Sequence, residues 1–173
     1  MKIIKHFVTI TKHRWEVRKI CFKIGIFYQG LTHDLSKYSP VEFFNGAKYY
    51  LGTKSPTIAE REDKGYSAAW MHHRGRNKHH FEYWFDSNEK GIYVPIKMPL
   101  KYLKEMFADR VAASKIYRGK KYTEDYPLDY LLTHRGKEML HPESFEKLKS
   151  WLTLLKEVGE KKTCKIIKKE KKY

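Results

Sequence analysis

The residues of this sequence best suited to chemistry are histidines and aspartates that stand close together. The chain has nine histidines in 173 residues. Three groups stand out, an adjacent His-Asp pair and two histidine doublets seven residues apart: His33-Asp34, His72-His73 and His79-His80. Because seven residues make about two helical turns, His73 and His80, or else His72 and His79, can share one face of a helix. Neutral imidazoles together with carboxylates are ligands for divalent transition metals such as manganese, iron, zinc, nickel or cobalt.

Another candidate ligand is Asp109, which falls inside an apolar helical repeat. It follows Met106 by three residues and precedes Ala113 by four, so that it lies on or beside the apolar face. A buried carboxylate is costly unless it is paired or bound to a metal. An ion pair with a neighbouring arginine would explain Asp109 alone, but the His-Asp pair and both doublets would then need separate structural explanations. One centre that holds one or two metal ions is the simpler hypothesis.

Helices must position these residues, because the apolar residues recur mostly at helical intervals. The pattern predicts helical segments over 1–29, 40–51, 66–85 on both sides of Gly75, 98–117 and 143–158. The start of the predicted helix 40–51 has three characteristic residues. Ser39 is in the N-cap position, Pro40 in the first helical position, and Glu42 three residues after the cap. Segment 86–97 is predicted to be a loop, and no segment shows convincing strand alternation. We therefore expect an all-α, single-domain bundle of about six helices over residues 1–158.

Most of the positive charge lies at the two ends of the chain. The sequence carries 36 Lys and Arg against 20 Asp and Glu, a formal charge of +16. Residues 1–30 contribute +6 and residues 161–173 another +6, while the 130 residues between them contribute +4. The lysine run has few apolar residues, so we expect 159–173 to be a flexible tail. The basic ends can contact nucleic acid, but most of the excess charge lies away from the candidate metal ligands.

Composition argues against several classes of protein. A hydrophobic content of 41% with 15% aromatics is too high for a disordered chain. Two cysteines, Cys21 and Cys164, cannot form a disulfide framework and favour a reducing compartment. No apolar run approaches the ~18–20 residues needed to cross a bilayer, and the basic N-terminus is a poor signal peptide. We therefore expect a cytoplasmic protein without a membrane partner, and its oligomeric state stays open.

The string LTHDLSKYSP, with His33-Asp34 followed by Lys37, resembles the H-D-x-x-K core of the HD-domain metal-dependent phosphohydrolases. That superfamily is all-α and has an upstream His, an adjacent His-Asp pair and a distant Asp. Many of its members add further histidine ligands and bind two metals. The strings LTHDLSKY, NKHHFEYW and KMPLKYLKEMFADRVAASKIY also resemble a family of small bacterial and phage proteins of unassigned function, over about residues 10–130.

The resemblance implies a set of metal ligands: His13, His33, Asp34, His73, His80 and Asp109. In this interpretation Asp34 bridges two metals, and His6 is an alternative to His13 as the upstream ligand. The implied activity is hydrolysis of a phosphorylated small molecule or nucleotide by a metal-activated water. Lys37, three residues after Asp34, would contact a substrate phosphate or the leaving oxygen, although it is also explained as a surface lysine.

Further residues around the doublets receive supporting roles in this interpretation. The cations that flank them, Arg74, Arg76 and Lys78, are predicted to hold substrate phosphates, or else to be solvated. The oxygen-bearing side chains of Asn77, Glu82 and Glu105 are predicted to accept hydrogen bonds from metal-bound imidazoles. Nearby aromatic residues, Tyr66, Trp70, Tyr83 and Trp84, either stack on a nucleobase or belong to the core.

Three other functions remain open on the sequence. The first is an HD-type nuclease whose basic ends hold the nucleic-acid backbone. The second is a non-enzymatic basic helical module that binds nucleic acid or a protein partner, with structural histidines. The third is a di-iron centre with oxygen chemistry, which some HD-like proteins carry. Metal content separates the second from the others, because only a module with structural histidines lacks stoichiometric metal.

Overall fold

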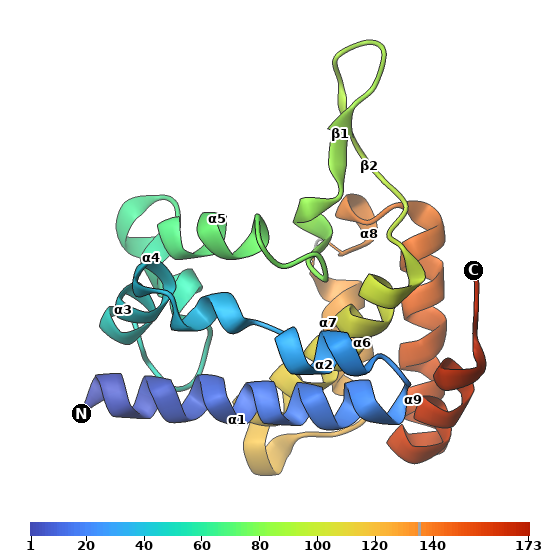
Figure 1. Ribbon diagram of the computed structural model, residues 1–173, viewed down its shortest axis with the longest axis horizontal. Helices are drawn as coiled ribbons and strands as arrows, with labels where there is room; N and C mark the ends of the chain where they lie inside the picture. Colours follow the sequence, from blue (N-terminus) through green and yellow to red (C-terminus); the bar gives the residue numbers. More distant parts are fainter. Residues whose placement is uncertain (135) are drawn as a thin grey trace.

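The computed structural model describes residues 1–134 and 136–173, and helices make up most of it (Figure 1). The longer helices are α1 (Lys2–Lys23), α3 (Pro40–Lys48), α4 (Pro56–Lys64), α6 (Leu100–Arg118), α7 (Tyr126–Thr133) and α9 (Pro142–Lys169). The shorter ones are α2 (Phe27–Thr32), α5 (Ala68–Arg74) and α8 (Gly136–Met139). Single 3₁₀ turns occur at Leu35–Tyr38, Phe81–Tyr83 and Gly119–Lys121. The predicted all-α, single-domain fold is confirmed.

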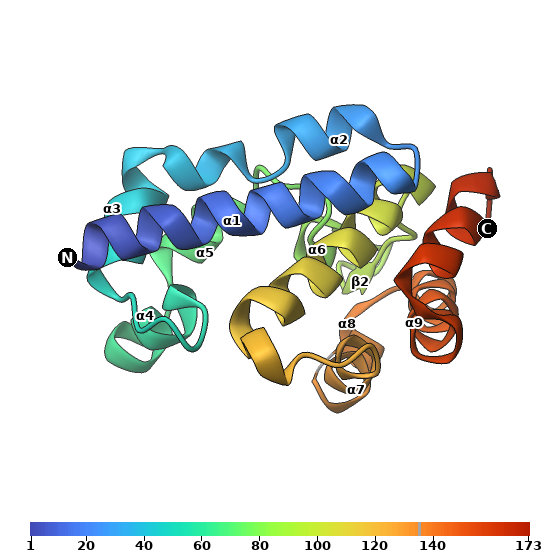
Figure 2. The same ribbon diagram turned by 90° about the horizontal axis from the view of Figure 1, so that it is seen from below.

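The apolar core lies where α1, α6 and α9 pack together. α1 runs along α2 and α6, and α6 in turn contacts α9 (Figure 2). Fully buried side chains of this core include Val17, Ile20, Phe107, Val111, Trp151 and Leu155. The buried stripe of α1 continues towards the N-terminus through Ile10, His13 and His6. The helical period that buries Val17 therefore also turns two histidines inward.

A β-hairpin replaces part of the predicted loop at 86–97. Strand β1 (Phe85–Ser87) pairs antiparallel with β2 (Tyr93–Pro95), with Asp86 opposite Val94. Figure 1 shows the hairpin projecting from the helical body. No strand signal is visible in the sequence here, because three-residue strands are too short to show alternation. The expectation of no strands was wrong at this one place.

The second histidine doublet is not on a helix, contrary to the prediction for 66–85. Helix α5 ends at Arg74, and the chain turns through Gly75 and Asn77 before the 3₁₀ turn at Phe81–Tyr83. The Asn77 side chain donates to the carbonyl of His73, which satisfies a carbonyl group at the helix end. The doublets are therefore brought together by a turn and not by a shared helical face.

Helix α4 was not predicted, because its sequence lacks an apolar stripe. Its residues are mostly charged, and Glu60 is its one fully buried residue. Pro56 at the start and Gly65, with φ of 78°, at the end mark its limits. Glu60 accepts a hydrogen bond from Ser67 just before α5, so α4 is held by polar contacts that periodicity does not reveal.

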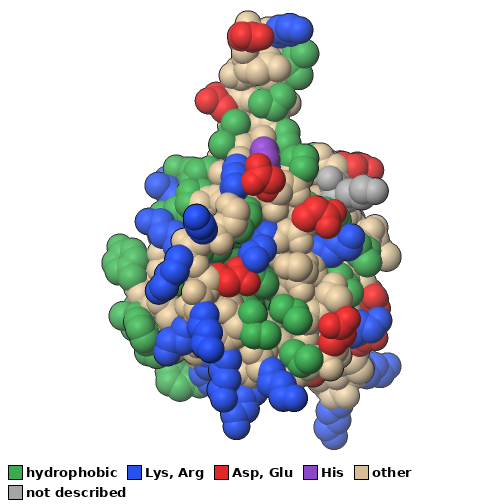
Figure 3. Space-filling model, turned by 90° about the vertical axis from the view of Figure 1, so that its right-hand side faces the viewer, with side chains coloured by type: hydrophobic (Ala, Val, Ile, Leu, Met, Phe, Trp, Pro, Cys, Tyr) green, Lys and Arg blue, Asp and Glu red, His purple; other side chains and the backbone are tan. Residues whose placement is uncertain are grey.

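The expected flexible tail is helical in the structure. Gly159, with φ of 78° and ψ of 163°, breaks α9, and the helix then resumes as far as Lys169. Cys164 and Ile167 of this last segment are buried in the core. The lysines of this segment are exposed. Figure 3 shows one face of the molecule, on which Lys and Arg side chains gather at the end opposite the hairpin. Within 1–134 and 136–173, no helix is long and apolar enough to cross a membrane.

Candidate metal centre

Histidines and carboxylates from separate parts of the chain converge at one buried place. The contributing segments are α1, the junction after α2, α5, the turn after α5, and α6. Among the described residues three groups of potential ligand atoms form there, one of which joins His33, His79 and Glu105. The other two are a first group, His13, His33, Asp34 and Asp109, and a second group, Asp34, His73, His79 and His80. The ligand atoms of each group lie within 4.8 Å of one another. Asp34 belongs to both the first and the second group.

Asp34 stands between the two groups and presents one oxygen to each. Its Oδ2 lies 3.3 Å from His33 Nε2, and its Oδ1 lies 3.2 Å from His73 Nε2 and 3.5 Å from His79 Nε2. The residue is fully buried, and neither oxygen has a hydrogen-bond partner of acceptable geometry in the described part of the chain. A buried carboxylate arranged in this way is suited to bridging two cations.

The first group surrounds Asp34 Oδ2 with two imidazoles and a second carboxylate. Asp109 Oδ1 lies 3.0 Å from His13 Nε2 and 3.5 Å from His33 Nε2. The upstream histidine of the arrangement is therefore His13. His6 lies two helical turns away, against the rings of Phe43 and Tyr50.

The second group contains three histidines. His73 Nε2 lies 2.9 Å from His80 Nε2, and His79 Nε2 faces Asp34 from the same turn. The sequence offered His73 with His80, or His72 with His79, as alternatives. The structure instead combines His73 with both members of the second doublet, because the turn after α5 points His79 and His80 to the same place.

Two outer carboxylates orient the imidazoles. Glu105 Oε1 accepts from the Nδ1 atoms of His33 (2.9 Å) and His79 (3.1 Å), and Glu42 accepts from Nδ1 of His73 (2.7 Å). Because a carboxylate accepts these bonds, Nδ1 carries the proton and Nε2 presents a lone pair to the centre. The Nε2 atoms of His33 and His79 are buried without a hydrogen-bond partner among the described residues. These unpartnered atoms suit a metal.

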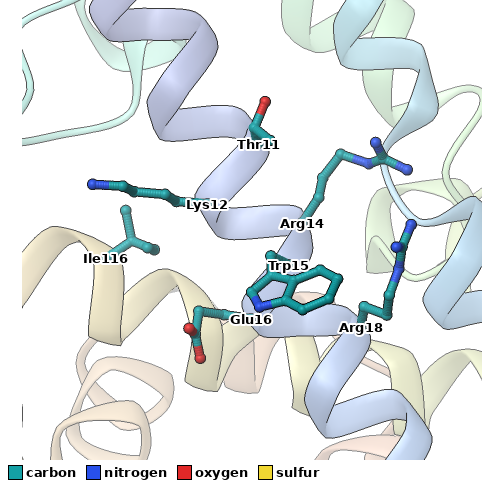
Figure 4. Close-up of a pocket in the computed structure, with 7 residues that line it drawn as sticks. All are labelled: Thr11, Lys12, Arg14, Trp15, Glu16, Arg18 and Ile116. Carbon is teal, nitrogen blue, oxygen red and sulfur yellow. The ribbon is translucent and has the colours of Figure 1, made fainter.

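The backbone at Asp34 is held in an unusual conformation. Asp34 has φ of 53° and ψ of 27°, and within 1–134 and 136–173 no other non-glycine residue has positive φ. This left-handed conformation is costly for most residues and less so for Asp. Arg14 leaves α1 on the side of α2 (Figure 4) and donates to the carbonyls of His33 (2.7 Å) and Leu31 (3.2 Å). These bonds fix the end of α2 so that His33 and Asp34 both turn inward.

The electrostatics of the centre favour a bound positive charge. Burial opposes ionisation of Asp34, but the facing His33 and Lys37 hold the pKa of Asp34 well below its ordinary value. Burial likewise opposes ionisation of Asp109, whose pKa is held low by hydrogen bonds from two imidazoles. Burial opposes protonation of His33, but the Asp34 carboxylate raises its pKa well above the ordinary value. Ionised carboxylates in this position attract a cation, whether a proton or a metal ion.

A cavity of about 940 Å³ opens onto the centre, and His13, His73, His80 and Asp109 line one part of it. Lys37 also lines the cavity, with its Nζ 2.6 Å from Asp34 Oδ2. The side chain of Lys37 is about 29% exposed, so it can meet both the centre and a ligand. Figure 2 shows the helices around the cavity, with α4 on one side and α6 and α7 on the other.

The cations predicted to hold phosphates lie elsewhere. Arg74, Arg76 and Lys78 are exposed and do not line the cavity. Arg76 donates to the carbonyl of His72, and Lys78 lies over the ring of Tyr83. Their side chains point outward because the chain turns after α5. The cations that do line the cavity, besides Lys37, are Lys54, Arg61 and Arg110.

The three predicted outer partners of the imidazoles lie in different surroundings. Glu105 contacts two of the imidazoles as described above. The amide nitrogen of Asn77 lies 3.1 Å from His73 Nδ1 and donates to Ser36 Oγ and the His73 carbonyl, both at 2.8 Å. Glu82 lines the cavity and makes no hydrogen bond to an imidazole among the described residues. Of the predicted aromatics, Trp70 lines the cavity, while Trp84 packs against the core.

Sequence reasoning missed Glu42, and it offered His79 only together with His72, as the alternative to His73 with His80. The alternatives arose because helical geometry lets only one member of each doublet face inward. Glu42 was explained as part of a capping box, but the Ser39 side chain makes no cap hydrogen bond. Glu42 instead turns into the protein, where it contacts His73 and also His72 Nδ1 (2.6 Å). A glutamate three residues after Ser39 is expected in a capping box, so its position in the sequence did not distinguish a capping role from contact with an imidazole.

Comparison with curated proteins and with solved structures gives no match. Residues 2–154, most of the chain and all of the ligand atoms described above, match the family described as "Family of unknown function (DUF5662)". The match carries no assigned activity, so that the geometry of the centre is the basis for any functional proposal. The chain belongs to the DUF5662 family.

Proposed function

We propose that this chain is a metal-dependent phosphoric ester hydrolase of the HD type, with a His/Asp centre for two metal ions. The observation that carries the proposal is the position of Asp34, whose two buried oxygens face separate groups of imidazoles. Lys37 Nζ pairs with Oδ2 at 2.6 Å, but among the described residues neither oxygen accepts a hydrogen bond from the imidazoles that face it, as it would in a purely structural His–Asp pair.

Each ion has a defined set of ligands in this proposal. One would be held by His13, His33, Asp34 and Asp109, and the other by Asp34, His73, His79 and His80. Mixed imidazole and carboxylate ligands suit manganese, iron, zinc, nickel or cobalt. The chemistry that such ions supply is a water of lowered pKa and neutralisation of charge on phosphoryl oxygens.

The protein's own side chains bind the substrate and hold the ligands in place. Hydrolysis joins a water oxygen to phosphorus and breaks the bond to the leaving oxygen, which departs with a proton. Lys37, at the edge of the centre, donates to a phosphoryl oxygen or to the leaving oxygen. Glu42 and Glu105 keep the Nε2 atoms of their imidazoles aimed at the centre.

The cavity favours a phosphorylated small molecule or nucleotide as substrate, since about 940 Å³ lies within the range of small-molecule sites. Aromatic side chains along it, including Trp70, Tyr126 and Tyr130, can pack against a planar ring. We place this activity in the cytoplasm, where thiols such as the buried, free Cys21 and Cys164 stay reduced.

Metal analysis and phosphatase assays of matched variants test the proposal. We expect wild-type protein to carry one to two transition-metal ions per chain and to hydrolyse phosphoesters when manganese is added. Asp34→Asn should lose both properties, and His79→Gln should lose about one ion. His72→Gln is the control, because His72 is a neighbouring histidine outside both groups and should keep the metal.

The other functions appear as distinct outcomes of the same assays. The metal centre would be refuted if wild-type protein carried no stoichiometric metal and Asp34→Asn changed neither metal content nor phosphatase activity. A non-enzymatic module would then remain. Bound iron with oxygen consumption and no phosphatase activity would indicate an oxygenase. Preferential cleavage of single-stranded DNA over nucleotides would indicate a nuclease. Circular dichroism of each variant separates loss of metal from loss of folding.

A further inference from the structure

The cavity continues beyond the metal centre to a second polar region. There it is lined by Arg61 of α4 and Arg110 of α6, together with Trp70 and Tyr130. Arg110 directly follows the candidate ligand Asp109, so this region adjoins the centre. A ligand that reaches from the metal centre into this region of the cavity can therefore contact both arginines.

The two arginines differ from the lysines of the same cavity in having no acidic partner. Lys54 pairs with Glu62 at 2.7 Å, and Lys37 pairs with Asp34 at 2.6 Å. Neither Arg61 nor Arg110 has a carboxylate within ion-pair distance among the described residues, and Arg61 lies over the ring of Trp70. The Nε of Arg110 is buried without any hydrogen-bond partner there. The buried Nε of Arg110 costs free energy unless an acceptor satisfies it, whereas the guanidinium of Arg61 is exposed and available to a ligand.

Glu82 does not supply the missing anion. It lines the same cavity, and its field acts on Arg110, but no ion pair joins the two side chains. One oxygen of Glu82 is itself buried without a partner in the described part of the chain. The buried Nε of Arg110 therefore stays an unsatisfied donor, which matches a ligand with acceptor oxygens.

We propose that Arg61 and Arg110 bind a second phosphoryl group of the substrate whose first phosphoryl group lies at the metal centre. The proposal rests on the phosphohydrolase function proposed above and names its substrate class, a small molecule with two or more phosphoryl groups. Guanidinium groups bind phosphate through paired, charge-assisted hydrogen bonds. A phosphoryl group of the ligand therefore suits two arginines better than a single carboxylate or hydroxyl group of the ligand does. A nucleoside diphosphate and a sugar bisphosphate share this chemistry.

A small molecule suits the site better than a nucleic acid. Both arginines line the cavity, Arg61 as an exposed side chain and Arg110 as a partly buried one, whereas no lysine of α9 lines it. A polynucleotide would be held along an exposed basic groove. The separation of the outer lysines from the cavity therefore favours a substrate that enters the cavity whole.

Substrate selectivity of matched variants tests the second subsite. The measured quantity is the ratio of kcat/KM for a two-phosphoryl substrate to kcat/KM for p-nitrophenyl phosphate, with manganese present. A nucleoside diphosphate and a sugar bisphosphate are assayed separately. The comparison shows whether the enzyme selects the two phosphoryl groups that they share or the nucleoside or sugar to which the groups are attached. We expect Arg110→Gln and Arg61→Gln each to lower this ratio about 10- to 100-fold, mainly through KM.

Arg118→Gln is the matched control, since Arg118 is an exposed arginine on the same helix as Arg110. Its ratio should equal that of wild type. An unchanged ratio in both cavity variants would refute the subsite. A wild-type preference for p-nitrophenyl phosphate or for single-stranded DNA over both two-phosphoryl substrates would refute it as well.

A binding measurement separates this proposal from the phosphohydrolase function. Thermal shift is recorded with inorganic pyrophosphate at fixed free manganese, and orthophosphate serves as the one-phosphoryl comparison. We expect pyrophosphate to raise the melting temperature of wild type more than orthophosphate does, and Arg110→Gln to remove the difference. Such binding without any hydrolysis would refute the hydrolase and keep the subsite. Hydrolysis of monoesters, with equal melting-temperature shifts for pyrophosphate and orthophosphate, would refute the subsite and keep the hydrolase.

Discussion

At the scale of single residues, the centre depends on carboxylates that each organise more than one imidazole. Glu105 bonds to His33 and His79, which are 46 positions apart in the chain. Burial opposes the ionisation of Glu105, but these two hydrogen bonds hold its pKa below the ordinary value. An ionised Glu105 accepts from both Nδ1 atoms and so aims both Nε2 atoms inward. Five histidines meet in this small region, and carboxylates at Nδ1 orient three of them, His33, His73 and His79.

His6 makes a separate contribution, to the pH dependence of stability. Burial, helped by the charge of Lys37, lowers the pKa of His6 from 6.5 to about 4. The folded protein thus keeps His6 neutral, while the unfolded chain takes up a proton below pH 6.5. Stability from this residue is complete above pH 6.5 and is lost as the pH falls towards 4, by about 3 kcal/mol in total.

Urea unfolding of wild type and His6→Gln between pH 4.5 and 7.5 measures this effect. The free energy of unfolding of wild type should fall more steeply below pH 6.5 than that of the variant. Parallel curves would show that His6 does not titrate differently on folding. A Cβ at Gly46 would lie 2.4 Å from His6 Nε2, so Gly46→Ala is expected to displace the ring and weaken the same effect.

At the scale of elements, the last helix shows how a lysine-rich segment becomes ordered. The backbone N–H of Glu160 donates to Glu124 just after the Gly159 break. The Glu160 carboxylate in turn pairs with Lys23 and Lys115, on α1 and α6. The C-terminal segment of α9 is therefore fixed at the break by polar contacts and then packs its few apolar residues on the core.

Two adjacent isoleucines test whether this segment contributes to stability. Ile167 is fully buried, while Ile166 is about 40% exposed. Ile167→Ala should lower the free energy of unfolding by about 2–5 kcal/mol, and Ile166→Ala by less than about 0.5 kcal/mol. Thermal or urea unfolding of the two variants provides the measurement. Equal, small effects would mean that the segment does not pack on the core in solution.

At the scale of the whole molecule, the metal centre joins elements that are far apart in the sequence. Its potential ligands come from α1, the junction after α2, α5, the following turn and α6. A bound ion would therefore cross-link most of the N-terminal two thirds of the fold. Since the unfolded chain does not assemble these ligands, metal binding should stabilise the folded state.

Removal of metal by a chelator should lower the melting temperature of wild-type protein. At a metal concentration 100 times the dissociation constant, the expected stabilisation is about 2.7 kcal/mol. Differential scanning calorimetry with and without chelator, followed by manganese addition, measures the change and its reversal. Asp34→Asn should show no response to chelator, and an equal response in both proteins would place the effect outside this centre.

The sequence by itself determined the helical class and the chemistry of the donor set. Apolar periodicity identified α1, α6 and much of α9, because these helices bury one continuous stripe, whereas Ser39 and Pro40 identified α3 by its start. The same local reasoning indicated a metal centre with His33, Asp34 and Asp109, since a carboxylate on an apolar face needs a partner. These conclusions depend on residue type and on spacing within a few helical turns, which a sequence displays directly.

Only the tertiary structure decided which side chains meet. The turn after α5 brings His79 and His80 together beside His73, and the packing of α3 against α5 brings Glu42 to the same imidazole. The cavity is lined by Arg61 and Arg110 as well as by the predicted Lys37, and it leaves out the predicted Arg74, Arg76 and Lys78. Such contacts join residues tens of positions apart, and the packing of helices sets them. Periodicity within one segment carries no information about where another segment packs.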